Sequence, residues 1–376
     1  MIRKLFGLFV QLFYFTPILR HNWTCRRSLL QPLYKTRNAE CGMQEGEHEN
    51  SEFKAQSSKT IIYMVQRETT FSGGLSDRLR GIVAIYAECK RQGLPFRLVF
   101  EPLHMEDYLE PNQYDWRIKD EDICWDTKEV YPCTLLTYHA STKNRYQHWV
   151  QQMVLRWYLR KPYRQIHVYS NMICRDDEYG VLFKELFRPT KELQEQLGYY
   201  LQHLGGAGNY ISCTFRFRQL LGDLKEGGDT LPESEREPYI HRCLDTLCRL
   251  QNQHPDKRIL VTADSPTFLD RVRSLSSGTN FESSNLKVQS SKLYVIPGNV
   301  VHIGFTFDAS KQTYMKSFVD MYMLSYASKV YLVRDKKMYH SGFPYRTALL
   351  NGAEYREITL NTGVIQTKNS VDVQKI

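Results

Sequence analysis

The hydrophobic pattern of residues 59–100 predicts a strand, a helix and a second strand. Lys59-Thr-Ile-Ile-Tyr-Met-Val65 is a run of β-prone apolar residues, which is typical of a buried strand. Beyond a Gly-rich turn at residues 73–81, apolar side chains recur at helical spacing to about Gln92, and residues 96–100 are again β-prone. This order predicts a βαβ unit that opens a parallel sheet.

The alternation of strands and helices returns after residue 205. Strands are predicted at residues 210–218, 258–263, 292–296 and 330–333, and helices at 238–252, 314–327 and 345–351. Gly205-Gly-Ala-Gly208 precedes this second series, and we interpret it as a hinge between domains. Because 376 residues exceed one domain of about 150 residues, we expect a leader and linker at 1–58 and two α/β domains at 59–205 and 206–376.

Two arginines lie at the end of the strand that opens the second domain. Thr214, Arg216 and Arg218 alternate with apolar residues, so they share one face of the strand. A guanidinium on a sheet is costly unless it meets an anion. At the carboxyl end of a strand, where open α/β sheets bind ligands, it can hold phosphate oxygens by two hydrogen bonds. The pattern indicates a phosphate-bearing ligand; the alternative is an edge strand with solvated arginines.

Further polar residues are expected at the same edge of the second sheet. Asp264-Ser265 and Ser341 each follow a short apolar strand and precede a helix, which places them beside Arg216. His302 lies in an apolar, β-rich stretch. Such a histidine is either a hydrogen-bonded core residue or part of the site.

The Gly-rich turn of the first domain is a second candidate for ligand contact. Gly73-Gly74 lacks the spacing of a dinucleotide fingerprint and of a P-loop. The turn can still bring backbone amides and the side chains of Asp77 and Arg78 to the mouth of the first sheet. For Asp77 the alternative role is that of a carboxylate stabilising a helix N-terminus.

Charge and cysteine content narrow the class of partner. Lys and Arg number 50 against 41 Asp and Glu, a net charge of +9, which suits an anionic small ligand, an acidic membrane surface or nucleic acid. The basic residues are spread along the chain without a zinc-finger or RNA-recognition signature, so we expect no nucleic-acid partner. Nine cysteines without a Cys-x-x-Cys pair indicate neither a disulfide framework nor a thiolate zinc site, and they favour a reducing compartment.

Residues 1–20 form a basic and then apolar leader that is short for a spanning helix. Three interpretations of this leader are open: an interfacial amphipathic anchor, an uncleaved signal-anchor, and a helix buried on the protein. We favour the first, because basic residues flank it and would meet anionic lipid; these are Arg3, Lys4, Arg20, Arg26 and Arg27. The expected location is the cytoplasm, peripheral to the inner face of a membrane. A signal-anchor would place the chain in the secretory lumen, where Asn22-Trp-Thr24 fits the glycosylation pattern.

Three motifs, taken in order, resemble those of the α1,2-, α1,6- and protein O-fucosyltransferase superfamily. They are Thr214-Phe-Arg216, where the family has a His-x-Arg strand and loop; the strand from Ile259 to Asp264-Ser265; and Ser317 to Val333 followed by Ser341-Gly-Phe343. The turn at residues 73–81 and Leu186-Phe-Arg-Pro189 are also similar. The resemblance covers about residues 60–355 and implies a GT-B fold, with two Rossmann-like parallel-sheet domains facing a central cleft. Thr214 replaces the family's His, and Gly74-Leu-Ser-Asp77 departs from its Gly-x-Gly-Asn turn.

The resemblance implies inverting transfer of fucose from GDP-fucose to a glycan hydroxyl, with no cofactor and no essential metal. The first domain would serve the acceptor and the second the donor. Arg216, assisted by Arg218, would contact the β-phosphate, and Asp264 would hold guanine or ribose. Ser341, with the amides of Gly342 and Phe343, would bind phosphate, and Asp320 would orient this loop. The remaining donor-binding candidates are Gly73, Gly74, Arg78, Ser265 and His302.

A base must take the proton of the acceptor hydroxyl. The resemblance places it in the loop after the arginine strand, so Glu226 and Asp223 rank above Asp77. Three alternatives stay open: a GT-B enzyme with another nucleotide sugar, a non-catalytic nucleotide-binding relative, and a membrane-surface scaffold. The acceptor is undetermined, and the basic leader favours a lipid-linked glycan.

Overall fold

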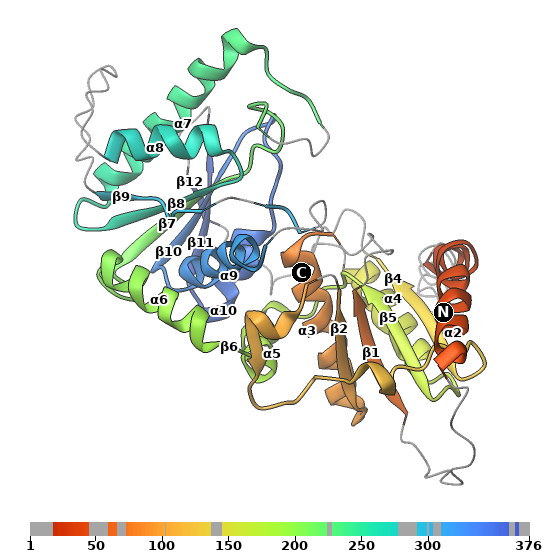
Figure 1. The fold of residues 1–376 in the computed structure, drawn as a ribbon. Coiled ribbons are helices and arrows are strands. Elements are labelled where there is room, and N and C mark those ends of the chain that lie inside the picture. The colour runs from red at the N-terminus through yellow and green to blue at the C-terminus, as the bar shows by residue number, and fades with distance from the viewer. Residues whose placement is uncertain are drawn as a thin grey trace, which may run out of the picture. The chain divides into compact units, whose positions relative to one another are not determined.

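The computed structural model describes residues 18–44, 59–65, 73–101, 103–136, 145–223, 228–276, 292–298, 301–303, 310–360 and 365–367. The chain divides into two compact α/β units, the first comprising Met1–Met105 and Pro111–Arg188, the second Glu106–Glu110 and Pro189–Lys375 (Figure 1). Strands β3 (Leu109–Pro111) and β6 (Phe187–Pro189) pair where the chain passes between the units. This division falls at residue 188, not at the predicted residue 205.

The first unit is built on a parallel sheet with the strand order β2-β1-β5-β4. Its strands are β1 (Thr60–Val65), β2 (Phe96–Phe100), β4 (Val130–Leu135) and β5 (Gln165–Ser170). Helix α3 (Leu75–Gln92) joins β1 to β2, which confirms the predicted βαβ unit. Helices α4 (Arg145–Leu159) and α5 (Asp176–Leu186) and the 3-10 turn η3 (Asp120–Asp122) also belong to this unit, and the 3-10 turn η2 (Met105–Asp107) lies at its boundary.

Gly81 lets α3 approach the sheet closely. A Cβ atom at Gly81 would lie 2.3 Å from the backbone oxygen of Ser170 and 2.4 Å from the hydroxyl of Tyr63. That hydroxyl has one proton, which the backbone oxygens of Arg78, at 3.2 Å, and of Ser170 share. A larger residue would therefore push the start of α3 away from β1 and β5.

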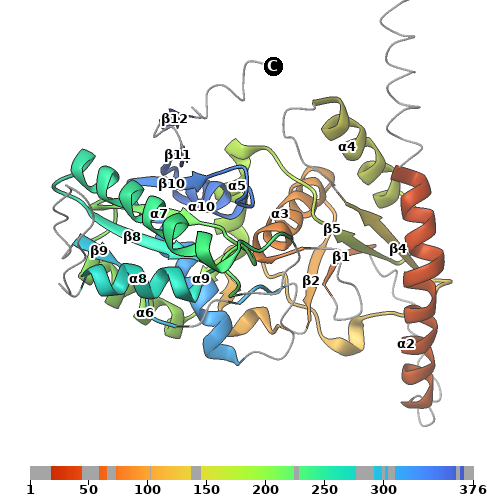
Figure 2. The same cartoon turned by 90° about the horizontal axis from the view of Figure 1, so that it is seen from above.

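The N-terminal helix is part of the first unit. Residues 18–25 are helical, and η1 (Arg26–Leu30), a π-helical stretch, leads into α2 (Gln31–Gln44). Leu30 and Tyr34 are fully buried and pack with Ile62 and Met64 of β1. Since side chains alternate along a strand, α2 covers the face opposite to Tyr63 and α3 (Figure 2).

This packing bears on the predicted leader and linker. Of the predicted leader, residues 1–20, the structure describes only 18–20; these belong to the helical segment 18–44, which packs on the first unit through Leu30 and Tyr34. Arg26 of the same segment stacks 4.4 Å from the ring centroid of Tyr131. Residues 1–17, where most of the predicted interfacial anchor falls, and 45–58 of the predicted linker lie outside the described residues. Within the described part of the chain, no helix has the length and apolar character needed to cross a membrane.

Asn22 is buried by the same packing. Its side chain is 3 % exposed, and its Oδ1 accepts hydrogen bonds from the backbone N–H of Thr134 and, at 3.1 Å, from the hydroxyl of that residue. The residue thus fixes the N-terminal helix to strand β4. In the folded chain, the Asn22-Trp-Thr24 triplet does not present its asparagine for glycosylation.

The second unit contains a larger sheet with the strand order β12-β11-β10-β7-β8-β9. Its strands are β7 (Tyr210–Phe215), β8 (Arg258–Ala263), β9 (Leu293–Tyr294), β10 (Lys329–Arg334), β11 (Glu354–Thr359) and β12 (Ile365–Thr367). All neighbouring pairs are parallel except β11 and β12. The two sheets confirm the predicted α/β class with two Rossmann-like parallel-sheet units.

Helices cover both faces of the second sheet (Figure 1). Helices α7 (Glu233–Gln253) and α8 (Pro266–Ser276) lie on one face, where Cys213, Phe215 and Val261 pack against Leu247 and Phe268. Helices α6 (Lys191–Leu204), α9 (Lys311–Ser325) and α10 (Phe343–Asn351) lie on the other face. The predicted hinge at residues 205–208 is instead a turn inside this unit, where Gly205, with φ of 85°, caps α6 before β7 begins.

Candidate functional site

The carboxyl ends of β7 and β8 bring predicted polar residues together at one edge of the second sheet. The two strands are parallel neighbours, and Thr214 pairs in register with Thr262. Their hydroxyls share a hydrogen bond of 2.8 Å. Arg216 and Asp264 each lie two residues beyond this pair, so the strand register places them side by side.

Asp264 holds Arg216 by an ion pair at this edge. Its Oδ2 accepts hydrogen bonds of 2.6 Å from a terminal guanidinium nitrogen of Arg216 and 2.6 Å from the backbone N–H of Arg218. Its Oδ1 accepts one of 2.7 Å from the backbone N–H of Phe217. The side chain of Asp264 is 3 % exposed; burial raises its pKa, and Arg216 and the backbone donors oppose that shift.

These contacts change what the two residues can do. Both carboxylate oxygens of Asp264 are engaged inside the protein, so its geometry favours a positioning role over the predicted contact with guanine or ribose. Arg216 keeps 15 % of its side chain exposed, so part of it stays accessible at this edge. The prediction that Arg216 contacts a ligand is compatible with this arrangement.

Arg218 and Tyr339 form a second contact at the same edge. Arg218 has a φ of 55°, in the left-handed region that residues with a Cβ seldom adopt. Its guanidinium lies 5.0 Å from the ring centroid of Tyr339. The backbone N–H of Tyr339, which follows β10, donates a hydrogen bond of 3.1 Å to the backbone oxygen of Arg216.

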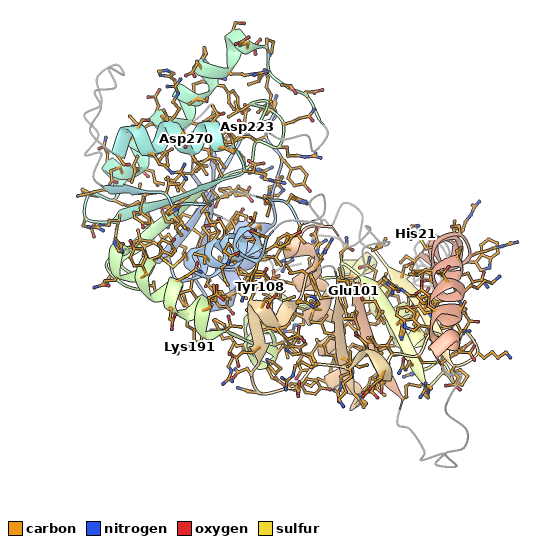
Figure 3. All side chains as sticks on the ribbon, viewed as in Figure 1. His21, Glu101, Tyr108, Lys191, Asp223 and Asp270 are labelled. Atoms are coloured by element: carbon orange, nitrogen blue, oxygen red, sulfur yellow. The ribbon has the colours of Figure 1, made fainter. Side chains whose placement is uncertain are left out.

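Asp223 is bound to the start of α8. One carboxylate oxygen accepts a hydrogen bond from the hydroxyl of Ser265, and the other accepts one of 2.5 Å from the hydroxyl of Thr267. Figure 3 labels Asp223 close to α8. The hydroxyl of Ser265, which is fully buried, also accepts a hydrogen bond of 3.1 Å from the N–H of Phe268. Asp223 therefore links the loop after β7 to the helix that follows Asp264.

The N-terminus of α10 is the third element at this edge. Ser341 is 8 % exposed, and its hydroxyl accepts a hydrogen bond of 3.2 Å from the N–H of Phe343. Gly342 caps the helix and accepts a hydrogen bond of 3.0 Å from the N–H of Arg346. The three predicted residues thus occupy the turn into α10, two positions after Tyr339.

The second unit holds three further candidates from the sequence, Asp320, His302 and Glu226. Asp320 forms an ion pair with Lys316 one turn earlier on α9, and burial raises the pKa of Asp320 against the effect of that lysine. His302 is partly buried in a segment without regular structure. Glu226, the first-ranked base, lies outside the described residues.

In the first unit, the predicted site residues stabilise the turn that begins α3. Arg78 is 1 % exposed; its Nε donates a hydrogen bond of 2.8 Å to the backbone oxygen of Gly73, and its guanidinium lies 5.5 Å from the ring centroid of Phe100. Gly73 has a φ of 76°, and a Cβ there would lie 2.4 Å from Oδ2 of Asp77. Gly74 is the N-cap of α3, and Asp77 pairs with Arg80 at 3.1 Å. The burial of Arg78 disfavours its predicted contact with the donor.

A cavity of about 260 Å³ lies elsewhere in the first unit, among α3, α4 and α5. Its lining is Arg91, His148, Gln152, Arg156, Cys174, Arg175 and Glu178. The guanidiniums of Arg91 and Arg156 donate to the buried Glu88 at 3.1 and 2.9 Å, and Arg91 also donates to Glu178 at 3.2 Å. These charges balance one another within the helices, so we assign no ligand to the cavity. Across the described residues, no three His, Cys, Asp or Glu side chains are grouped as a metal site would require.

Two residues at the edge of the second sheet were not anticipated. Tyr339 lies in the turn before Ser341, and the rule that polar or aromatic residues after an apolar strand face the ligand edge would have included it. Thr267 occupies the first turn of α8. Its bond to Asp223 depends on the fold of the loop after β7, which no local pattern specifies.

Comparison with known proteins shows a shared fold. The sequence matches no protein-family model and none of the curated proteins. The crystal structure of fucosyltransferase NodZ from Bradyrhizobium is similar with a TM-score of 0.50 and 13 % identity, over 83 % of this chain and 99 % of that one. A mutant of FUT1 from Arabidopsis thaliana, in complex with GDP, is similar with a TM-score of 0.47 and 12 % identity, over 91 % of this chain and 78 % of that one. POFUT1 in complex with GDP is similar with a TM-score of 0.45 and 11 % identity, over 81 % of this chain and 99 % of that one. The similarity to NodZ bears out the predicted GT-B-like fold.

Proposed function

We propose that this chain is a glycosyltransferase that moves fucose from GDP-fucose to a glycan hydroxyl with inversion. One observation carries the proposal. In a fold shared with the fucosyltransferase NodZ, an arginine held by a buried carboxylate occupies the carboxyl edge of the second sheet. Open α/β sheets bind their ligands at that edge. Arg216 is also the residue that the motif resemblance assigns to the phosphate.

The geometry supports a role for Arg216 in stabilising the leaving group. As the bond from fucose to the β-phosphate breaks, negative charge accumulates on GDP, and a fixed cation lowers the energy of that state. Asp264 fixes the guanidinium before substrate arrives, at 2.6 Å. The turn from Ser341 to Phe343 adds the amides of a helix N-terminus, which favour phosphate. We propose that these groups act without an essential metal.

The transfer also needs a base. The acceptor oxygen forms a bond to the anomeric carbon of fucose while the carbon–oxygen bond to GDP breaks, and the hydroxyl proton passes to a carboxylate. Asp223 already accepts hydrogen bonds at both of its oxygens, so we place Glu226 first, Asp223 second and Asp77 third. This order rests on the contacts of Asp223 and on the resemblance.

We propose that the acceptor is a glycan, and that the preferred candidate is a lipid-linked glycan at the cytoplasmic face of a membrane. The net charge of +9 and the basic, apolar residues 1–17 support peripheral contact with anionic lipid. The burial of Asn22 argues against use of its glycosylation triplet, and so removes one argument for the secretory lumen. A GT-B enzyme with another nucleotide sugar is the alternative, because every fold-level feature would be the same.

Calorimetric titration of the full chain with GDP, GDP-fucose and UDP tests the donor. The whole chain is required, since α2 belongs to the core of the first unit. We expect the guanine ligands to bind and UDP not to, and Arg216→Ala to abolish binding. Arg273→Ala is the matched control, because that arginine pairs with Asp270 on the outer surface of α8 at 2.6 Å. Equal or absent binding of all three ligands would refute the proposal, and binding of GDP-fucose without turnover would favour a non-catalytic relative.

A further inference from the structure

The ring of Tyr339 is exposed at a position where the backbone is held firmly. Tyr339 is 50 % exposed, one of the large side chains with apolar surface left in solvent. Its main chain, in contrast, is bonded to the backbone oxygen of Arg216, and the neighbouring Met338 is buried. The exposed ring thus belongs to a residue whose backbone is hydrogen-bonded to Arg216, the arginine that we propose to contact phosphate.

The guanidinium of Arg218 lies 5.0 Å from the centroid of this ring, and the backbone of Arg218 is held in an unfavourable conformation. The left-handed φ of 55° is accompanied by the hydrogen bond from its N–H to Asp264. Such strain persists where the surrounding structure imposes it, and it occurs often at ligand sites. Asp264 thereby holds both the guanidinium of Arg216 and the backbone of Arg218, the residue whose guanidinium lies 5.0 Å from the ring centroid of Tyr339.

We propose that Tyr339, supported by Arg218, is the surface on which the nucleobase of the donor stacks. This inference rests on the proposed function and assigns a residue that the motif resemblance does not include. A flat aromatic base has a π face that stacks on a tyrosine ring, and a nearby guanidinium adds a cation–π contribution. The sugar of the donor has no π system and could meet the ring only through its C–H groups. The position next to Arg216 fits a base whose diphosphate is held by that arginine.

The experiment compares a ligand that has a base with one that lacks it. Calorimetry of the full chain with GDP and with inorganic pyrophosphate is carried out for wild type, Tyr339→Ala and Tyr339→Phe. Loss of stacking should weaken GDP binding about 5- to 140-fold in Tyr339→Ala, the range that alanine substitution at base-stacking rings produces. Pyrophosphate affinity should stay within about twofold, and Tyr339→Phe, which retains the ring, should bind both ligands like wild type.

Tyr199→Ala is the matched control. Tyr199 is 56 % exposed on α6 of the same unit, where its ring lies 4.2 Å from that of His203, and its removal should change neither affinity. Unchanged GDP affinity in Tyr339→Ala would overturn the stacking role while leaving the proposed function intact. A parallel loss of pyrophosphate affinity would also overturn it, since the ring would then act only through the arginines. Failure of wild type to bind GDP would refute the proposed function and this inference with it.

GDP-fucose provides one more readout on the same variants. If the base stacks on Tyr339, Tyr339→Ala should weaken GDP and GDP-fucose by the same factor, because both carry the base. A loss confined to GDP-fucose would contradict the proposal and assign the ring to the sugar.

Discussion

The carboxylate of Asp264 lies 2.6 Å from a guanidinium nitrogen of Arg216 across the ends of β8 and β7. The two strands are parallel and in register, so the fold of the sheet itself brings the charges together. The same carboxylate accepts two backbone N–H groups from the segment after β7. One buried side chain therefore shapes the edge at which the ligand is proposed to bind.

Replacing Asp264 should destabilise the protein and weaken donor binding. Removing one partner of a buried ion pair leaves the other charge without compensation, at a cost of about 3–5 kcal/mol. We expect Asp264→Asn to lower the free energy of unfolding by about 3 kcal/mol in a urea titration, and GDP affinity to fall at least about tenfold. Asp270→Asn is the control, since its pair with Arg273 is exposed and should contribute below about 1 kcal/mol. Similar losses in the two variants would contradict a special role for Asp264.

Asp223 and Glu226 should differ in the step that they affect. Asp223 fastens the loop after β7 to Ser265 and Thr267, so Asp223→Ala should lower GDP affinity and fucosyl transfer together, each about three- to tenfold, which corresponds to about 1 kcal/mol. Glu226→Gln should abolish transfer while GDP affinity remains within about twofold, because a base is needed only for the chemical step. Single-turnover assays beside calorimetry separate the two effects. An Asp223→Ala enzyme that binds GDP normally but does not turn over would make Asp223 the base.

The main elements of both units could be predicted from hydrophobic periodicity, and the reason is visible in the burial. Strands such as Ile259–Ala263 are buried on both faces, so their sequences are continuous apolar runs. The alternation of Arg216 with apolar neighbours correctly placed it at the carboxyl edge. Arg218 does not continue the alternation as predicted. Its backbone has a left-handed φ and donates a hydrogen bond to Asp264, which is far away in the sequence.

Long-range packing also explains the parts that could not be predicted. Leu30 and Tyr34 lie in a polar and basic stretch for which the sequence predicts a leader and linker. Only their contacts with β1 show that the helix belongs to the core. Arg78 was expected at the ligand because it follows a Gly-rich turn. Its burial beneath Phe100 depends on how α3 meets the sheet, to which Gly81 contributes.

The N-terminal helix should be required for the stability of the first unit. The hydroxyl of Tyr34 lies 2.6 Å from Nδ1 of His167 and 3.1 Å from the hydroxyl of Tyr169, all in a buried setting. Tyr34→Phe leaves these groups without that partner, at a cost of about 1–3 kcal/mol. Tyr34→Ala adds a cavity and should cost about 3–5 kcal/mol. Urea unfolding of the full chain measures both.

The control for Tyr34 lies on the same helical segment. Trp23 is 60 % exposed, so Trp23→Ala should change the free energy of unfolding by no more than about 0.5 kcal/mol. Deleting residues 1–44 should leave the apolar face of the first sheet uncovered and cause aggregation or loss of the cooperative transition. A truncated chain as stable as the full chain would disprove that α2 is part of the core.

His167 should make the first unit less stable in acid. Burial lowers the pKa of His167 to about 3, whereas a histidine in the unfolded chain titrates near 6.5. Below that pH the unfolded state binds a proton that the folded state excludes, so folding stability falls by about 1.4 kcal/mol per pH unit between about pH 6.5 and pH 3. Above pH 6.5 both states hold the neutral imidazole, and this contribution to the pH dependence disappears.

His167→Gln should remove that part of the slope, measured by urea unfolding at pH 7.5, 6.5, 5.5 and 4.5. Because all other titrating groups are common to both chains, an identical slope in the variant would show that His167 does not stay neutral in the folded state.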